Sequence, residues 1–178
     1  MRKVLFILGQ LTDADADWLA RIGQRQKIAA GTELIRHGTH IDTIYIVLEG
    51  SLSVLAANGV KLADVGCGDI LGEMSLVDSG LTAASVRGDQ ECVVLAVPKQ
   101  VLQEKLNADA PFAARFYRAL SLFLADRMRN TIRRMGYGKD EPGPQAQTEF
   151  DELDPDVLDR VHLAGARFER LLKRMAGG

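Results

Sequence analysis

Cysteine is scarce in this sequence of 178 residues, and nothing around its two cysteines makes them chemically prominent. Cys67 and Cys92 form no close pair of the kind that binds metals, and the chain shows no secretion signal that would favour a disulfide. The histidines at positions 37 and 40 flank a glycine turn without matching ligands. We therefore predict no disulfide and no metal site, and we expect both cysteines to be small buried apolar side chains.

Long apolar runs and an excess of positive charge are missing as well. The apolar run at residues 4–8 is shorter than the roughly 7–15 residues of a signal-peptide core, and no run approaches the roughly 18 residues of a membrane span. The 22 basic residues stand against 24 acidic residues, and the resulting net charge of −2 gives no general attraction to nucleic acids. These absences predict a soluble, cytoplasmic protein that binds neither DNA nor a membrane.

Between residues 27 and 97 the sequence contains short β-type runs separated by glycines. The runs cover residues 43–48, 51–55, 61–65 and 92–97. A tight hairpin turn is signalled by Asn58-Gly59. This texture predicts an antiparallel, jelly-roll-like β-roll, and together with the helices around it the fold class is α+β.

Helices are predicted on both sides of the roll. Thr12 and Asp15 form a capping box for a short helix over residues 12–22. Asp109 can cap a long helix over residues 109–135, in which apolar residues recur at every fourth position. The arginines of this helix gather near its carboxyl end, where the helix dipole favours cations, and we expect them to form an exposed face: residues 127, 129, 133 and 134.

The C-terminal part of the chain is predicted to lie outside the roll domain of residues 1–136. Residues 137–153 have the proline, glycine and charge content of a linker, and residues 154–176 form an amphipathic helix. Its apolar residues are spaced alternately four and three apart, as in a helix that packs on another helix: Val157, Val161, Ala164, Phe168, Leu171 and Met175. Such a seam fits packing on the chain's own domain, and it fits a dimer equally well.

Residues 68–76 carry the pattern that says most about function. Two glycines let the backbone approach a ligand closely, and Gly72 opens a short helical turn whose amides at residues 73–75 could hold a phosphate. Glu73 would repel a phosphate, but its carboxylate could accept a hydrogen bond from a hydroxyl group such as that of a ribose. The combination suggests a nucleotide, although a plain capped turn would explain the same residues.

Five motifs make the sequence resemble the cyclic nucleotide-binding domain family, which occurs in catabolite activator protein, kinase regulatory subunits and gated ion channels. The resemblance covers about residues 5–135. The motifs, in their order along the chain, are Gly-Thr-Glu-Leu-Ile-Arg-His-Gly at 31–38, Tyr-Ile-Val-Leu-Glu-Gly at 45–50, Gly-Asp at 68–69, Gly-Glu-Met-Ser-Leu at 72–76 and Ala-Ser-Val at 84–86.

The resemblance implies a binding site and a ligand. The phosphate-binding cassette of the family would lie between residues 72 and 86. Glu73 would accept from the ribose hydroxyl, the amides near Met74 and Ser75 would hold the cyclic phosphate, and the long helix would close over the base or pair two subunits. The ligand would be cAMP or cGMP, with no further cofactor, and the binding residues would be Leu71, Gly72, Glu73, Met74, Ser75, Thr82 and Ala83.

One position departs from the family pattern. The family's cassette usually carries an arginine nine residues after the glutamate, where it pairs with the phosphate, and this chain has Thr82 there, followed by Ala83. A charge-assisted hydrogen bond contributes about 1.5–3 kcal/mol, so its loss would weaken phosphate binding roughly 10- to 150-fold. Arg87 is the nearest cation along the chain, but it points outward if Ala84 and Val86 face the core of their strand.

These observations favour a sensor module that acts on a partner protein through movement or dimerisation of its long helix. A homodimer would form through residues 112–135 or 157–175. No catalytic set of residues is evident, so we do not expect an enzyme. Only a linker and one helix follow where related transcription factors carry a helix-turn-helix, so we do not expect DNA binding. Two alternatives remain open, namely a degenerate roll that serves only as an interaction scaffold and a sensor of another anion such as a cyclic dinucleotide.

Overall fold

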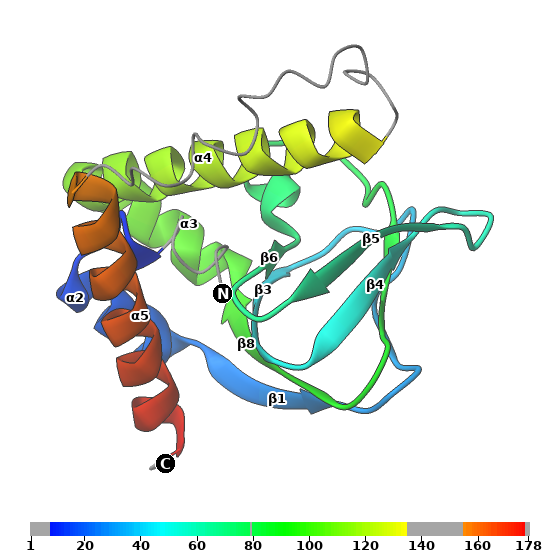
Figure 1. Cartoon of the computed structure of the whole chain (residues 1–178), viewed down its shortest axis with the longest axis horizontal. Coiled ribbons are helices and arrows are strands. Elements are labelled where there is room, and N and C mark those ends of the chain that lie inside the picture. The colour runs from blue at the N-terminus through cyan, green and yellow to red at the C-terminus, as the bar shows by residue number, and fades with distance from the viewer. Residues whose placement is uncertain (1–7, 79, 135–154, 177–178) are drawn as a thin grey trace, which may run out of the picture.

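Figure 1 shows the protein as a computed structural model that describes residues 8–78, 80–134 and 155–176. A β-roll lies under the long helix α4, and α5 stands beside α2 at one end of the molecule. The elements in chain order are α2 (Asp13–Ile22), β1 (Gln24–Ile28), β2 (Glu33–Ile35), β3 (Thr43–Glu49), β4 (Ser51–Leu55), β5 (Lys61–Gly66), β6 (Ile70–Leu71), the short 3-10 helix η1 (Glu73–Leu76), β7 (Ser85–Gly88), β8 (Cys92–Pro98), α3 (Lys99–Ala108), α4 (Ala110–Arg134) and α5 (Pro155–Ala176).

The strands of the described residues form two antiparallel sheets of four. One sheet has the order β1-β8-β3-β6 and the other the order β2-β7-β4-β5. The predicted α+β roll is confirmed, and the four runs predicted as strands correspond to β3, β4, β5 and β8. β1 was not among them, because four of its five residues are exposed and it lies at the edge of its sheet. Such a strand carries no apolar pattern in the sequence.

The central strands β3 and β8 are buried on both faces. Along β8, Val93, Leu95 and Val97 pack under the helices, whereas Cys92 and Val94 pack between the two sheets. A strand that is covered on both sides needs apolar side chains at nearly every position, which explains the unbroken apolar run at residues 92–97. The described residues therefore form two apolar cores, one between helices and sheet and one inside the roll.

The helices α2 and α4 are joined through one carboxylate. Asp15 accepts from the Thr12 amide at 2.8 Å, and the Thr12 hydroxyl accepts from the Asp15 amide at 3.2 Å, so the predicted capping box is confirmed. Arg115 of α4 donates to the same carboxylate through Nε and Nη2 at 2.8 and 3.0 Å. α4 itself begins where predicted, with the Phe112 amide donating to the Asp109 carboxylate at 2.9 Å.

The apolar stripe of α4 leaves the core as the helix proceeds. Phe116 and Leu120 are buried and Leu124 packs on the core in part, but Met128 and Ile132 are 66% and 40% exposed. The second half of the helix therefore extends beyond the helical core with an apolar face that is open to solvent.

α5 packs on its own chain. Ala164 and Leu171 belong to the core under the helices, and Phe168 packs against the same core. Arg167 donates to Asp13 at the start of α2 at 2.6 Å, which fixes one helix on the other. The sequence allowed the apolar seam of α5 to pack on the chain's own domain or in a dimer. The seam residues that the structure describes pack on the chain's own domain. The predicted linker of residues 137–153 and the side chains of residues 157, 161 and 175 lie outside the described residues.

The prediction for the cysteines was right for one and wrong for the other. Cys92 is buried inside the roll, but Cys67 is exposed because it lies in the turn between β5 and β6. Both are free thiols. His37 and His40 are exposed. Within the described ranges, no helix is long and apolar enough to cross a membrane, and no group of three or more potential metal ligands is found.

Candidate ligand-binding site

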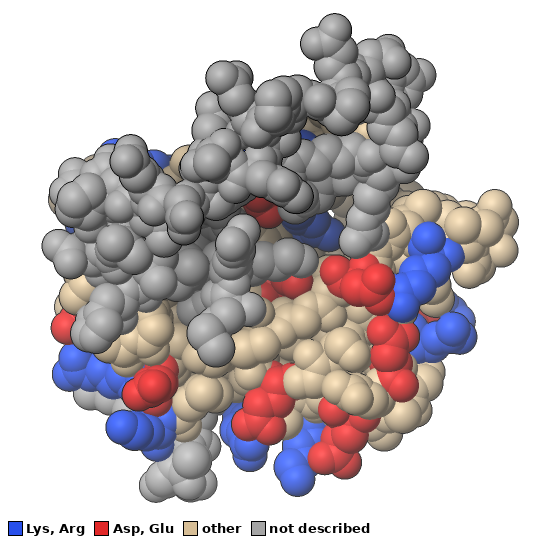
Figure 2. Space-filling view, viewed as in Figure 1, with Lys and Arg blue, Asp and Glu red and all other residues tan. Residues whose placement is uncertain are grey.

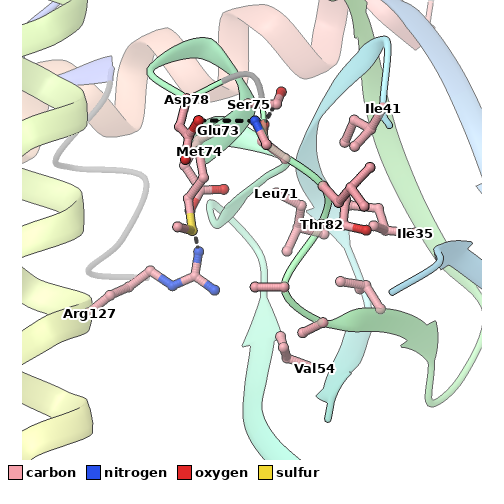
Figure 3. Close-up of a pocket in the computed structure, with 16 residues that line it drawn as sticks. Ile35, Ile41, Val54, Leu71, Glu73, Met74, Ser75, Asp78, Thr82 and Arg127 are labelled. Atoms are coloured by element: carbon pink, nitrogen blue, oxygen red, sulfur yellow. Dashed lines mark hydrogen bonds and ion pairs between the residues drawn. The ribbon is translucent and has the colours of Figure 1, made fainter. Parts of the chain in front are cut away.

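A cavity of ≈ 130 Å³ opens between η1, the interior of the roll and α4 (Figure 3). Its floor is apolar and comes from the strands, with Ile35 of β2, Val54 of β4 and Val86 of β7. All seven residues that the sequence predicted as ligand-binding line this one cavity, although they come from two separate segments of the chain: Leu71, Gly72, Glu73, Met74, Ser75, Thr82 and Ala83. The predicted short helical turn after Gly72 is therefore confirmed, and it lies at the cavity.

Gly72 is required at the start of η1. Its φ of +79° lies in the left-handed region, and a Cβ atom there would overlap the side chain of Ile41 and come within 3.1 Å of the Thr43 carbonyl. Any other residue would be strained and would push the turn away from the loop before β3. The glycine thus lets the cassette lie tightly against the roll.

The backbone of η1 is held by hydrogen bonds within the turn. The amide and the hydroxyl of Ser75 both donate to the Gly72 carbonyl, at 3.1 and 2.7 Å. The amides of Val77 and Asp78 both donate to the Met74 carbonyl, at 3.0 and 2.8 Å. The Ser75 amide thus has an acceptor inside the turn, and its role as a phosphate donor stays a prediction.

Glu73 is the most unusual group of the site, because it is a carboxylate with only 3% of its side chain exposed. Its Oε1 accepts from Nη1 of Arg127 at 2.6 Å. Burial raises the pKa of Glu73, and the guanidinium of Arg127 opposes that rise without cancelling it. The carboxylate therefore has a high free energy in its charged form and depends on a partner that donates to it.

Arg127 was expected on an exposed face, and that expectation was wrong. Its side chain is 31% exposed, and its guanidinium lies 5.4 Å from the centre of the Phe123 ring. Phe112, Phe116 and Phe123 are buried, and Arg127 follows Phe123 by four positions on the same face of α4. This helical spacing was the signal that could have placed Arg127 on the buried side of α4, although it does not identify Glu73 as its partner.

Thr82 lies across the cavity from Arg127 (Figure 3). Its hydroxyl accepts from the Thr39 amide at 3.1 Å and donates to the Arg36 carbonyl. Its backbone also pairs with the same loop, through the Gly38 and Thr39 peptide groups at 2.9 Å. In this chain the position therefore ties the cassette to the loop between β2 and β3.

The charges around the cavity are few. Arg87 points away from it, since Val86 is buried and Arg87 is exposed on the outer face of β7, as anticipated. Among the described residues that line the cavity, the acidic ones are Glu73 and Asp78, and Arg127 is the one basic residue. Where Figure 2 shows described residues, acidic and basic side chains are interspersed. An apolar cavity with a few polar groups suits the binding of a small molecule.

Comparison with known proteins gives results that agree with this geometry. Residues 25–109 match the family model described as the cyclic nucleotide-binding domain. The chain is similar to an uncharacterized NTE family protein of Mycobacterium tuberculosis, with 27% identity over 118 residues that make up 66% of this chain and 20% of that protein. It is also similar to the CRP-like protein Clp of Xanthomonas campestris, with 28% identity over 119 residues, 62% of this chain and 50% of that protein.

Solved structures show the same fold. A cyclic nucleotide-binding domain from Methylobacillus flagellatus has a TM-score of 0.68 and 21% identity, over 75% of this chain and 81% of that one. Clp of Xanthomonas campestris, described as a c-di-GMP responsive global regulator, has a TM-score of 0.63 and 20% identity, over 91% of this chain and 92% of that one. The chain spans about a fifth of the mycobacterial relative and half of the curated Clp sequence.

Proposed function

The chain belongs to the cyclic nucleotide-binding domain family, and on this premise we propose that it is a regulatory module that binds a cyclic nucleotide in the cavity beside η1. The observation that carries the proposal is the convergence of the seven predicted binding residues from two segments on one cavity, with the buried carboxylate of Glu73 at its edge. A buried carboxylate is retained where a polar partner meets it, and a ribose hydroxyl would be such a partner.

The proposal includes a change of shape on binding. The cavity of ≈ 130 Å³ is smaller than the roughly 300–1,000 Å³ of pockets that enclose drug-sized ligands. Leu71, Val54 and Ile35 belong to the interior of the roll and leave little freedom on that side. The wall that can move is therefore the one formed by η1 and α4, and binding of a nucleotide would displace α4.

α4 is also the element that would pass the signal on. Beyond the core it carries the exposed apolar side chains of Met128 and Ile132, and Tyr117 and Leu122 are 43% and 37% exposed earlier on the helix. A displaced α4 would present these side chains differently to a partner protein or to a second copy of the chain. Regulation through such a contact is the output that we propose.

Three observations keep two alternative functions in view. The small cavity and the hydrogen-bonded Thr82 favour a roll that binds no ligand and acts as an interaction scaffold. The relative Clp is described as c-di-GMP responsive, which favours a cyclic dinucleotide as the ligand. The scaffold alternative predicts that no nucleotide binds, and the dinucleotide alternative predicts that c-di-GMP binds in place of cAMP or cGMP. One set of titrations therefore separates the three functions.

The experiment has two parts and uses the full chain. Small molecules released from the freshly purified protein by denaturation are identified by mass spectrometry, and the protein is then titrated calorimetrically with cAMP, cGMP and c-di-GMP. The proposal expects cAMP or cGMP to bind at one site per chain, with weaker binding to Glu73→Ala and unchanged binding to the control Glu91→Ala, an exposed glutamate. Binding of c-di-GMP alone would support the dinucleotide alternative. No released nucleotide and no heat with all three ligands would support the scaffold.

A further inference from the structure

An anion that enters the cavity meets very little positive charge from the residues that the structure describes. Arg127 is the one basic side chain among the described lining residues, and the carboxylates of Glu73 and Asp78 line the same cavity. Without Arg127, the charged side chains of this lining would all be negative, and a phosphate would be repelled. Anion binding therefore depends on the guanidinium that α4 supplies.

Position 82 cannot take over this task in the arrangement observed. The Thr82 hydroxyl already donates to the Arg36 carbonyl and accepts from the Thr39 amide, and Ala83 offers no polar side-chain atom. Arg87 lies on the outer face of β7. Among the described lining residues, the positive charge therefore lies on the helix side of the cavity, opposite Thr82 (Figure 3).

Arg127 is well placed to change partners. Its guanidinium offers five N–H donors in a planar fork, a shape that suits carboxylates and phosphates equally. It is held over the Phe123 ring, and Nη1 donates to Glu73 at 2.6 Å. Arg127 also lines the cavity, and its long side chain is partly exposed, so its guanidinium lies within the reach of a ligand in the cavity.

We propose that Arg127 binds the anionic group of the ligand, and that it does so by exchanging the Glu73 carboxylate for that group. The inference rests on the proposed function. Exchange leaves Glu73 buried without its cation, which is unfavourable unless a hydroxyl of the ligand donates to the carboxylate. The site therefore selects ligands that carry a phosphate and a free hydroxyl close together, and it discriminates against a phosphate alone.

The exchange also explains how binding is coupled to α4. In the structure, the ion pair joins the second half of α4 to the cassette, so Arg127 holds the helix over the cavity. When the ligand takes the guanidinium, this direct link between α4 and Glu73 is lost. The position of α4 then depends on the bound ligand.

The test compares Arg127→Gln with Arg129→Ala, which removes an exposed arginine of the same helix. Calorimetric titrations with cAMP, cGMP and c-di-GMP at fixed salt are expected to show binding weakened roughly 10- to 150-fold in Arg127→Gln, as for loss of a charge-assisted hydrogen bond, and unchanged in Arg129→Ala. Arg127→Lys, which keeps the charge without the planar fork, should fall between wild type and Arg127→Gln. Urea unfolding of each variant establishes that it is folded at the titration temperature.

A second probe isolates the exchange step. Inorganic phosphate carries the anion without the hydroxyl arrangement of a nucleotide, so we expect it to bind weakly to the wild type and more tightly to Glu73→Gln, in which Arg127 no longer has to leave a carboxylate. Arg127→Gln that binds cyclic nucleotide as tightly as the wild type would overturn the inference and leave the proposed function intact. Phosphate binding that is not strengthened by Glu73→Gln would overturn the exchange. No nucleotide binding by any of the proteins would overturn both proposals.

Discussion

The hydroxyl of Thr82 provides a direct test of the structure around the cassette. Thr82→Val keeps the size and branching of the side chain and removes both hydrogen bonds of the hydroxyl. The Arg36 carbonyl loses one donor but still accepts from the Thr39 hydroxyl at 2.8 Å. The Thr39 amide loses the acceptor that holds it at 3.1 Å. The effective loss is therefore one hydrogen bond at a half-buried position, and we expect about 1 kcal/mol of lost stability.

Two measurements report on this substitution. Urea unfolding gives the change in global stability, and amide hydrogen exchange gives the local change, for which roughly fivefold faster exchange is expected at Thr39 if the loop opens locally. Thr32→Val serves as a control, because Thr32 is an exposed threonine of a neighbouring loop. If Thr82→Val has wild-type stability and unchanged exchange at Thr39, the cassette is not tied to the loop by this side chain.

The same bonds determine what an arginine at position 82 would do. Thr82→Arg would add a charge-assisted partner for a phosphate, worth roughly 10- to 150-fold in affinity, but it also breaks the contacts with Arg36 and Thr39. If restoring the loop costs about 1 kcal/mol, the net gain falls to roughly 2- to 30-fold. A gain above this range in calorimetric titrations with cAMP would show that the loop does not oppose the substitution.

Three further predictions follow from buried groups. Burial raises the pKa of Glu73, so the folded chain holds the carboxyl proton more tightly than the unfolded chain, and the free energy of unfolding should fall as pH rises above 4.5 through the folded pKa. Glu73→Gln should remove this fall in urea unfolding at pH 4–7. A difference in stability between wild type and variant that is constant with pH would contradict the prediction. Arg115→Ala leaves the buried Asp15 without its bidentate partner and should cost about 2 kcal/mol, less than the 3–5 kcal/mol of a fully buried pair because the guanidinium is partly exposed. Leu171→Ala should cost about 2–5 kcal/mol in the same assay and Leu163→Ala, at an exposed position of α5, less than about 0.5 kcal/mol. Equal effects of the two leucines would mean that α5 is not docked.

Local signals in the sequence were sufficient for much of the fold. The capping box at Thr12 and Asp15 involves residues three positions apart, so the sequence alone could place it. β8 was predictable because burial on both faces demands an unbroken apolar run. β1 was not, because an edge strand with exposed side chains has no apolar pattern and is defined by its pairing with β8. Cys67 was wrongly predicted to be buried, because the exposure of its side chain depends on the turn between β5 and β6 that contains it.

The residues of the site also divide into those that the local sequence could predict and one that it could not. The cassette residues around Gly72 and Glu73 could be predicted, since they lie in one short motif and a resemblance points to the second segment at Thr82. Arg127 could not be assigned, because its partner lies 54 positions earlier in the chain and the helix-dipole pattern offered a sufficient explanation for the charge. A salt bridge between distant segments is a property of packing and leaves no mark on local sequence.

The most direct test of the central claim is an NMR titration of the isotopically labelled full chain with cAMP and with cGMP, followed by amide chemical shifts. Because the proposed nucleotide enters the cavity and releases Arg127 from Glu73, we predict saturable shifts at Gly72, Glu73, Met74 and Thr82, together with shifts along α4 around residue 127. Shifts that are confined to other surfaces, or no shifts at concentrations up to the millimolar range, would contradict the claim that this cavity is a cyclic-nucleotide site.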